Sequence, residues 1–347
     1  MKAIVILNPH AHSDHTPMQI KPVRDEVSEH LKKSVHVDQV EWRETKHPGH
    51  GKDLAEQATR DGYDIIFAGG GDGTVNEVLN GIMGLKLEPK KRPILGVLPF
   101  GTSNDFFAGL KTAETARKTN NGNNLTMVLD VGHVLFDSVE RHFCLTTGMG
   151  LFSWANEQYL EQSHTFGRRF AHIPSAISTI ASYRFLLDVR ISRDGKQSHA
   201  RRILSVVIDN SPVIGGGTPM TPNAKIDDGQ LDVCIIKPAP LLQLLWLAVK
   251  LSLKTPPRSR DVELGRIREM TVTAQQPLPI HVDGELIPEL DSKARRMVVK
   301  VMPGALRVVL PSLCEIHVKP AAEIGTLSVQ DSQTGAQRVP AQATSHT

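Results

Sequence analysis

The sequence has few cysteines and no long apolar run. Its 347 residues include three widely spaced cysteines, Cys144, Cys234 and Cys314. An odd number without CxxC spacing excludes a disulfide framework and favours a reducing compartment. The longest apolar stretch, Leu241 to Leu253, has about 13 residues and contains a lysine, so it is too short to span a bilayer. The N-terminal apolar run is also too short for a signal peptide, and we expect a cytoplasmic protein.

The chain also lacks a strong excess of either charge. Forty Lys and Arg residues against 37 Asp and Glu residues leave a net charge of +3. Such a small excess argues against a nucleic-acid-binding protein, but it is compatible with contact with an anionic membrane surface. The length allows two domains, and the 40% hydrophobic content is that of an ordinary globular protein.

The most informative stretch is AGGGDGTVNE at residues 68–77. The apolar run before it, Ile65–Ala68, predicts a buried strand, and the apolar spacing over residues 75–83 predicts a helix. Thr74 and Glu77 have the spacing of a capping box, which places the start of this helix at Thr74. A strand, a glycine turn and a helix N-terminus together favour binding of an anion, most often a phosphate.

Two common phosphate motifs are absent from this turn. A Walker loop needs a Lys after the glycines, and the dinucleotide motif GxGxxG needs a Gly where Thr74 stands. Asp72 lies inside the turn, and a carboxylate beside phosphates is repulsive without a cation. The turn therefore implies a divalent metal ion.

The order of patterns along the chain predicts two domains. Strand-like runs at residues 3–7, 35–40, 65–68 and 93–98 alternate with helical patterns, which indicates an α/β domain with a parallel sheet over residues 1–130. Short β-type runs separated by Asp-Gly turns follow, so residues 131–318 are predicted to form an antiparallel β-rich domain. Helical insertions are expected at residues 173–185 and 241–253. The polar segment 319–347 is predicted to be a disordered tail.

Three later turns carry polar residues suited to binding or catalysis. Residues 98–105 (LPFGTSND) combine a glycine and hydroxyl groups, and a simple helix cap is the alternative. Residues 224–232 (AKIDDGQLD) place carboxylates before a turn glycine, where they hold a hard cation or form an ordinary β-turn. In residues 281–285 (HVDGE), either Asp283 or Glu285 is a candidate general base, and a surface hairpin is the alternative.

Taken together, these segments resemble the soluble bacterial diacylglycerol kinase-like family of lipid kinases, which is related to sphingosine kinases. The resemblance extends from Asn8 to about Leu310. The matching motifs are Gly70–Glu77, Leu98–Asp105, Leu129-Asp130, Gly215–Gly217, Asp228–Asp232 and Asp283–Glu285.

The resemblance implies a fold and a set of ligands. It implies an N-terminal α/β nucleotide-binding domain with a parallel sheet, as in phosphofructokinase and NAD kinase, and a C-terminal antiparallel β-sandwich-like domain. ATP would be the phosphate donor and Mg²⁺ the metal. The implied nucleotide contacts are Asn8, Pro9, His10, Ala11, His12, Thr45, Gly70, Gly71, Asp72, Gly73, Thr74, Val75, Asn76, Glu77, Gly101, Thr102, Asn104 and Asp105.

The resemblance also implies the metal and catalytic residues. Asp228, with backbone oxygens of Lys225 and Gln230, would hold a structural magnesium. Asp72, Asp105 and Asp130 would shape a water–magnesium network near the phosphates. Glu285 would accept the proton of the lipid hydroxyl, with Asp283 as the competing candidate. The partner would be a lipid at the inner membrane surface, and the oligomeric state is open, with a homodimer as one option.

The chain departs from the family pattern in places. The family's NPxSG start is here Asn8-Pro9-His10-Ala11-His12, and no helical period follows Leu310. Two rival functions are an NAD kinase or sugar-phosphate kinase, and a lipid-binding regulator without catalysis. We expect the scattered histidines to be surface residues rather than metal ligands. Residues 166–170 (FGRRF) precede a core helix or contact lipid headgroups. Residues 241–247 form a buried helix or expose an apolar face to lipid.

Overall fold

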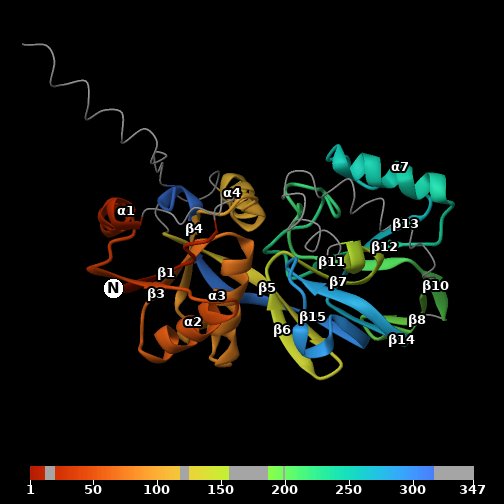
Figure 1. Ribbon diagram of the computed structural model, residues 1–347, viewed down its shortest axis with the longest axis horizontal. Helices are drawn as coiled ribbons and strands as arrows, with labels where there is room; N and C mark the ends of the chain where they lie inside the picture. Colours follow the sequence, from red (N-terminus) through yellow and green to blue (C-terminus); the bar gives the residue numbers. More distant parts are fainter. Residues whose placement is uncertain (12–19, 118–124, 156–186, 198–199, 316–347) are drawn as a thin grey trace, which may run out of the picture.

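The computed structural model describes residues 1–11, 20–117, 125–155, 187–197 and 200–315. Figure 1 shows two domains side by side, with β5 (Thr126–Phe136) and β15 (Lys293–Val309) lying where they meet. Several predictions lie outside the described residues: His12, the helix at residues 173–185, the segment 166–170 and the tail 319–347.

The N-terminal domain is built on the predicted parallel sheet. Strands β1 (Lys2–Leu7), β2 (Gln39–Glu44), β3 (Ile65–Gly70) and β4 (Ile94–Pro99) pair in the order β4-β3-β1-β2. Because β1, β3 and β4 are buried almost throughout, they have the continuous apolar character of parallel strands rather than an alternation. The helices of this domain are α1 (Ile20–Ser34), α2 (His50–Arg60), α3 (Asp72–Gly84) and α4 (Asp105–Arg117), with a short 3₁₀ helix, η1 (Pro89–Lys91).

Two predictions of element starts in this domain were wrong. Strand β2 begins at Gln39 rather than at residue 35, because α1 continues to Ser34 and His36, with a φ of 58°, interrupts the extended backbone after it. Helix α3 begins at Asp72, with Gly71 as its N-cap and no side-chain cap. The predicted capping partner Glu77 instead accepts hydrogen bonds from Gly49 N and Gly51 N, both at 2.7 Å, at the start of α2. An anionic side chain at a helix N-terminus stabilises the helix, because it accepts hydrogen bonds from N–H groups that have no intrahelical acceptor and it lies at the positive end of the helix dipole.

The C-terminal domain is the predicted β-sandwich. Apart from β5 and β15, its strands are β6 (Val139–Phe143), β7 (Thr146–Gly150), β8 (Leu187–Arg193), β9 (Lys196–Gln197), β10 (Arg201–Ile203), β11 (Ser205–Asp209), β12 (Leu231–Ile236), β13 (Val262–Ile267) and β14 (Glu269–Val282). They pair antiparallel. Strand β14 belongs to both sheets, because residues 269–279 pair with β15 and β8 whereas residues 280–282 pair with β7. The apolar side chains of both sheets form one core between them.

Within the described residues, helix α7 (Leu241–Ser252) packs on the outer face of this sandwich. On β11, Val206 and Ile208 face the core between the sheets, whereas Val207 faces outward and packs in a separate cluster with Leu244 of α7. This alternation is the period of two expected of a strand. None of the helices in the described ranges is long and apolar enough to cross a membrane.

Two long strands and the C-terminal segment unite the domains. The first half of β5 and the second half of β15 belong to the N-terminal core, and their other halves belong to the C-terminal core. Val308 of β15 pairs with Leu95 of β4, so the sheets are continuous. After β15, the 3₁₀ helix η3 (Pro311–Leu313) packs on α1, where Ser34 Oγ donates to Leu313 O at 3.0 Å. The sequence showed no helical pattern after Leu310. In the described residues, the chain instead returns to the first domain through β15 and η3.

Candidate active site

The predicted nucleotide-binding segments meet at one edge of the parallel sheet. The strand register places the carboxyl ends of β1, β2, β3 and β4 side by side. Asn8 follows β1, and its Nδ2 donates to Thr74 Oγ1 at 3.3 Å, while its backbone N–H donates to Gly69 O at 2.8 Å. Thr45 follows β2, and its N–H donates to Leu7 O at 2.8 Å. Ligands bind at this edge in open α/β sheets.

The glycine turn is pressed against the loop that follows β4. A Cβ atom on Gly101 would lie 2.2 Å from Gly71 Cα, so neither loop could remain in place with a larger residue there. Asn104, with a φ of 52°, fixes the second loop. Its Oδ1 accepts from Gly101 N at 3.1 Å, and its Nδ2 donates to Gly101 O at 2.7 Å and Pro99 O at 3.2 Å. Thr102, which lies between Gly101 and Asn104 in the chain, is exposed.

The N-terminus of α3 leaves backbone donors free at this edge. The N–H groups of Asp72, Gly73 and Thr74 belong to the first turn of the helix, where no intrahelical acceptor exists. Within the described part of the chain, no other group accepts them. These donors, together with the helix dipole, suit an anion such as a phosphate.

Asp72 and Asp105 connect the glycine turn to the second domain. Asp72 accepts from the N–H groups of Asp105 and Phe106, both at 3.0 Å, so it caps α4. Burial raises the pKa of Asp72 to about 6. Asp105 in turn accepts from Gly216 N at 2.7 Å, and burial raises its pKa. Gly216 has a φ of 82°, which only glycine adopts readily.

The predicted metal ligands form a separate group at the turn before β12. Asp130 accepts from Gly229 N at 2.6 Å and from Gly304 N at 2.8 Å, which fixes this turn against β15. Asp228 accepts from Gln230 N at 3.1 Å through one oxygen. Among the described residues, its other oxygen has only a long ion pair with Arg266, at 3.9 Å. Among the described contacts, none joins this group to the glycine turn.

The two candidate bases at the turn after β14 have different surroundings. Asp283 is buried and accepts four hydrogen bonds: from Cys144 N at 3.0 Å, Leu145 N at 2.9 Å, Thr146 N at 2.8 Å and Asn76 Nδ2 at 2.7 Å. Burial raises its pKa, and the four donors oppose this rise. Both of its oxygens are therefore occupied in holding β14 against α3 and the start of β7.

Glu285, in contrast, has a free carboxyl group that faces the glycine turn. Its Oε1 lies 2.7 Å from the position that a Cβ atom on Gly73 would take. No described residue donates a hydrogen bond to this carboxyl group. Burial raises its pKa to about 8, with smaller contributions from Glu77 and Asp283 and an opposing effect of Arg141. The structure thus brings Glu285, but not Asp283, to the anion-binding end of α3.

Part of this arrangement was not expected from the sequence. Asn76 was predicted to contact nucleotide, yet its side chain is buried and donates to His142 O at 3.1 Å as well as to Asp283. Asn80, one helical turn later, also donates to His142 O, at 2.9 Å, and accepts from His142 N at 2.9 Å. Val75 is buried in the core. Two asparagines four residues apart on an otherwise apolar helix face were the available signal for this domain contact.

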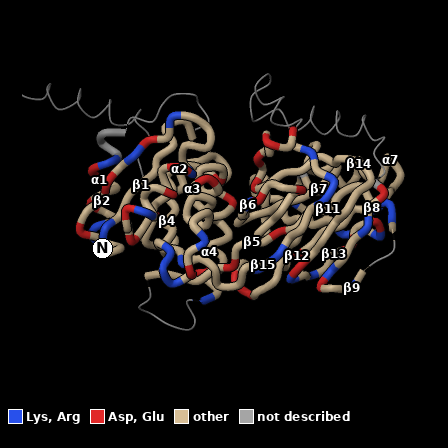
Figure 2. The backbone as a smooth tube through the Cα atoms, turned by 90° about the horizontal axis from the view of Figure 1, so that it is seen from below, with Lys and Arg blue, Asp and Glu red and all other residues tan. Residues whose placement is uncertain are grey.

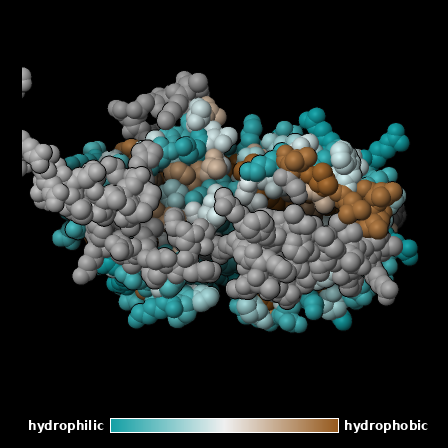
Figure 3. All heavy atoms as spheres, turned by 45° about the horizontal axis from the view of Figure 1, so that its top comes forward, coloured by the Kyte–Doolittle hydropathy of each residue, from teal (hydrophilic) through white to brown (hydrophobic). Residues whose placement is uncertain are grey.

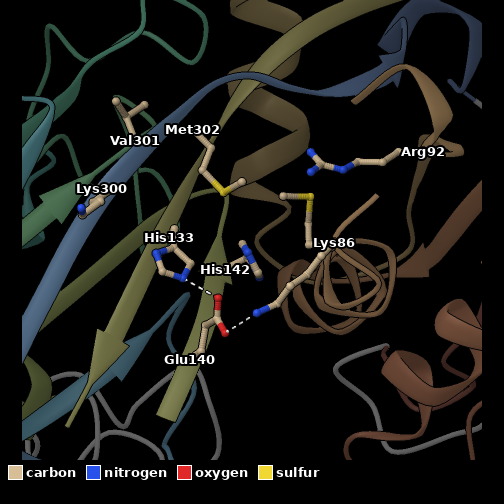
Figure 4. A pocket seen from close by; sticks show the side chains of 9 residues that line it. Lys86, Arg92, His133, Glu140, His142, Lys300, Val301 and Met302 are labelled. Carbon is tan, nitrogen blue, oxygen red and sulfur yellow. Dashed lines mark hydrogen bonds and ion pairs between the residues drawn. The ribbon is translucent and has the colours of Figure 1, made fainter. Parts of the chain in front are cut away.

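A pocket lies at the C-terminal end of α3, away from the glycine turn (Figure 4). It has a volume of about 370 Å³, and Lys86, Arg92, His133, Glu140 and His142 are among its lining residues. His133, Glu140 and His142 are close enough to hold a metal ion. Glu140, however, is already paired with His133 Nε2 at 2.7 Å and with Lys86 Nζ at 3.4 Å. The surrounding cations oppose a further positive charge, and we assign no ligand to this pocket.

Comparisons with known proteins match both domains. The profile described as "Diacylglycerol kinase catalytic domain" matches residues 2–134, and that described as "YegS C-terminal NAD kinase beta sandwich-like domain" matches residues 148–310. The chain is 28% identical to a diacylglycerol kinase of Bacillus subtilis over 67% of its own length and 74% of that protein. It is 27% identical to a diacylglycerol kinase of Staphylococcus carnosus, over 67% and 73% of the two chains.

Solved structures show the same fold. A diacylglycerol kinase from Bacillus anthracis superposes with a TM-score of 0.62 at 19% identity, over 89% of this chain and 96% of that one. Another structure from the same strain gives a TM-score of 0.65 at 22% identity, over 89% and 97%.

Proposed function

Because this chain belongs to the diacylglycerol kinase-like family of lipid kinases, we propose that it transfers the γ-phosphate of ATP to a hydroxyl group of diacylglycerol or a related lipid. We further propose that Glu285 is the general base. The observation that carries this assignment is the free carboxyl group of Glu285, whose Oε1 faces Gly73 in the first turn of α3. Donors for phosphate and an acceptor for a proton therefore lie together.

The chain's own residues account for most of what such a reaction needs. The free N–H groups at the start of α3 would hold and orient the phosphate chain, since phosphoryl transfer depends mainly on positioning and charge stabilisation. Glu285 would take the proton of the lipid hydroxyl as the hydroxyl oxygen attacks the γ-phosphorus. The bond between that phosphorus and the oxygen bridging it to the β-phosphate would break, and ADP would leave. A pKa of about 8 suits a base near neutral pH. Asp283 would act as a positioning residue, because its four hydrogen bonds fix the turn that carries Glu285.

The predicted Mg²⁺ fits two places in the chain to different degrees. Asp228 has one oxygen without a close partner, and a carboxylate with neighbouring carbonyl groups of Lys225 and Gln230 is a donor set for a hard cation. The carboxylates Asp72 and Asp105 at the glycine turn, and Asp130 at the turn that carries Asp228, already accept backbone hydrogen bonds, so they would act on a metal through water. A bound Mg²⁺ would neutralise charge on the phosphates.

The decisive experiment measures transfer of labelled phosphate from ATP to lipids in mixed micelles. The panel contains diacylglycerol, monoacylglycerol, phosphatidylglycerol, a sphingoid base and ceramide, each with and without Mg²⁺. We expect at least one lipid to accept phosphate, and chelation of Mg²⁺ to abolish transfer. If no lipid is phosphorylated by a folded preparation that binds ATP, the kinase assignment fails and a regulator without catalysis is the better interpretation.

The same assay separates the other rival function. NAD replaces the lipid in a parallel reaction, because an NAD kinase would also use a GGDG-type turn and a sandwich domain of this kind. Phosphorylation of NAD without any lipid product would overturn the proposal in favour of an NAD kinase.

A further inference from the structure

Helix α7 presents an apolar face that no described part of the molecule covers. Leu242 is 79% exposed, Trp246 60% and Leu253, at the end of the helix, 71%, and Leu241, Leu245 and Val249 are between 38% and 47% exposed. Their spacing of three and four residues places all six on one side of the helix. The opposite side, which includes Leu244, packs on the sandwich. Figure 3 shows apolar residues gathered on this side of the C-terminal domain.

All charged residues in the segment that contains α7, residues 237–260, are basic. The segment contains Lys237, Lys250, Lys254, Arg258 and Arg260 and no Asp or Glu. The ammonium group of Lys250 lies 5.7 Å from the centre of the Trp246 ring. An exposed tryptophan beside a lysine is typical of a side-chain pair at the boundary between lipid and water.

We propose that this α7 face docks the protein on the surface of an anionic lipid bilayer. The leucine and tryptophan side chains would enter the boundary between headgroups and acyl chains, and the basic residues around them would contact lipid phosphates. A second copy of the chain is a less favourable partner for this face. A twofold contact would place two such segments against each other, each with five cations and no acidic residue.

The position of the face relative to the candidate active site supports a bilayer. At the end of α7, Lys254 Nζ lies 3.2 Å from where a Cβ atom on Gly217 would be. The neighbouring Gly216 donates to Asp105, and the N–H of Asp105 donates to Asp72 in the glycine turn. In Figure 1, both α7 and α4 lie towards the top of the view. On the premise of the proposed function, this face would bring the site to the membrane that contains its lipid substrate.

The test is binding of the full chain to vesicles, measured by co-sedimentation without ATP. Vesicles of phosphatidylcholine alone are compared with vesicles that also contain phosphatidylglycerol. The test variant carries Leu242→Glu and Trp246→Glu, and the control variant carries Val128→Glu on β5, where the valine is 47% exposed. We expect tighter binding to the anionic vesicles, a loss of about tenfold or more in the test variant, and no loss in the control.

A second charge variant and two further readouts make the outcomes distinct. Arg258→Gln with Arg260→Gln is expected to weaken binding to anionic vesicles only. Equal binding of the wild type and the Leu242/Trp246 variant overturns the proposal. So does a wild-type dimer that this variant converts to a monomer in the absence of lipid, since the face would then join two copies. If vesicle binding behaves as expected but no lipid accepts phosphate in micelles, the docking face stands and the proposed kinase function fails.

Discussion

Asp283 and Glu285 are two residues apart, yet their carboxyl groups have opposite environments. Four donors surround Asp283, whereas Glu285 has none among the described residues and faces Gly73. A carboxylate that is saturated with hydrogen bonds is poorly suited to take a proton, because protonation would break those bonds. The geometry therefore favours Glu285 as the base in the proposed reaction.

The first prediction concerns the pH dependence of activity. Glu285 must be ionised to accept a proton, and burial raises its pKa to about 8. We expect kcat/KM to rise with pH up to about 8 and to level off above it, because kcat/KM reports the ionisation of the free enzyme. In Glu285→Gln, kcat should fall by roughly 10²–10⁴ and this rise should disappear. A wild-type profile that is retained in the variant would exclude Glu285 as the base.

The same substitution has an expected effect on stability that serves as its control. The folded pKa of Glu285 lies above its ordinary value of 4.5. As pH rises from about 4.5 to 8, the unfolded chain loses this proton before the folded chain does, so the folded state loses stability over this range. Glu285→Gln should therefore melt at the same or a higher temperature than wild type at pH 8. A lower melting temperature would mean that lost activity reflects misfolding.

The second prediction concerns Asp283. In Asp283→Asn, the amide NH₂ group would face backbone N–H groups that now donate to a carboxylate. We expect the free energy of unfolding to fall by about 2–4 kcal/mol in denaturant titrations. The matched control is Asp291→Asn. Asp291 shares a left-handed φ, of 48°, but its side chain is 97% exposed, so a change within about 0.5 kcal/mol is expected. Equal losses in the two variants would contradict the structural role of Asp283.

The sequence identified the residue types of this site but could not choose between them. Both carboxylates lie in one Asp-Gly-Glu turn, and the local pattern treats them alike. The contact that distinguishes them joins Asp283 to Asn76, 207 residues earlier in the chain. Such a pairing depends on how two domains pack, which neither periodicity nor turn chemistry contains.

At the scale of the element, α3 connects the anion-binding turn to the domain contact. Its first turn presents Gly73 to Glu285, and its next residues present Asn76 and Asn80 to β6 and β14. The capping-box prediction failed here because Glu77 was available to a different helix, α2, through tertiary packing. The strand before the turn and the apolar face after it were predicted, since those depend on local patterns.

The third prediction concerns the first turn of this helix. Gly73→Ala places a methyl group 2.7 Å from Glu285 Oε1. Alanine is a better helix former than glycine, so the melting temperature should not fall, but Glu285 must move. We expect kcat to decrease by about tenfold or more, as is common when a reacting group is misplaced. The matched control is Gly84→Ala at the other end of α3, where a Cβ atom meets nothing within 4 Å. Loss of activity in both variants would contradict the contact.

Helix α7 illustrates a different limit of sequence patterns. Its position at residues 241–252 was predicted closely, but the pattern did not show which side would be buried. Apolar residues occur all round this helix, so no polar side identifies the solvent. Only the packed structure separates Leu244 from the exposed Leu242 and Trp246.

At the scale of the whole molecule, the two domains are not independent units. Figure 2 shows the backbone continuing from one domain to the other along β5 and β15. The profile matches end at residue 134 and resume at residue 148, yet β15, near the end of the chain, completes the core of the first domain. The sequence placed the domain boundary near Asp130, where composition changes. It could not show that a distant strand returns, because nothing local in β15 distinguishes its two halves.

The last prediction concerns the contribution of β15 to the core of the N-terminal domain. A fragment of residues 1–134 lacks Leu306, Val308, Val309 and Cys314, all at most 1% exposed in the N-terminal core. It also loses the pairing of β5 with β15. Removing this many buried side chains costs more than the usual stability of a domain, about 5–15 kcal/mol. We therefore expect the fragment to show no cooperative thermal transition by circular dichroism.

A chain ending at residue 315 provides the matched comparison, because it keeps every residue of these contacts. We expect it to unfold in a single transition, since one continuous sheet and two shared strands couple the cores. Cooperative melting of the 1–134 fragment would show that the N-terminal domain is stable without β15. Two separate transitions in the longer chain would show that the cores unfold independently. Either result would contradict the coupling of the two cores through β5 and β15.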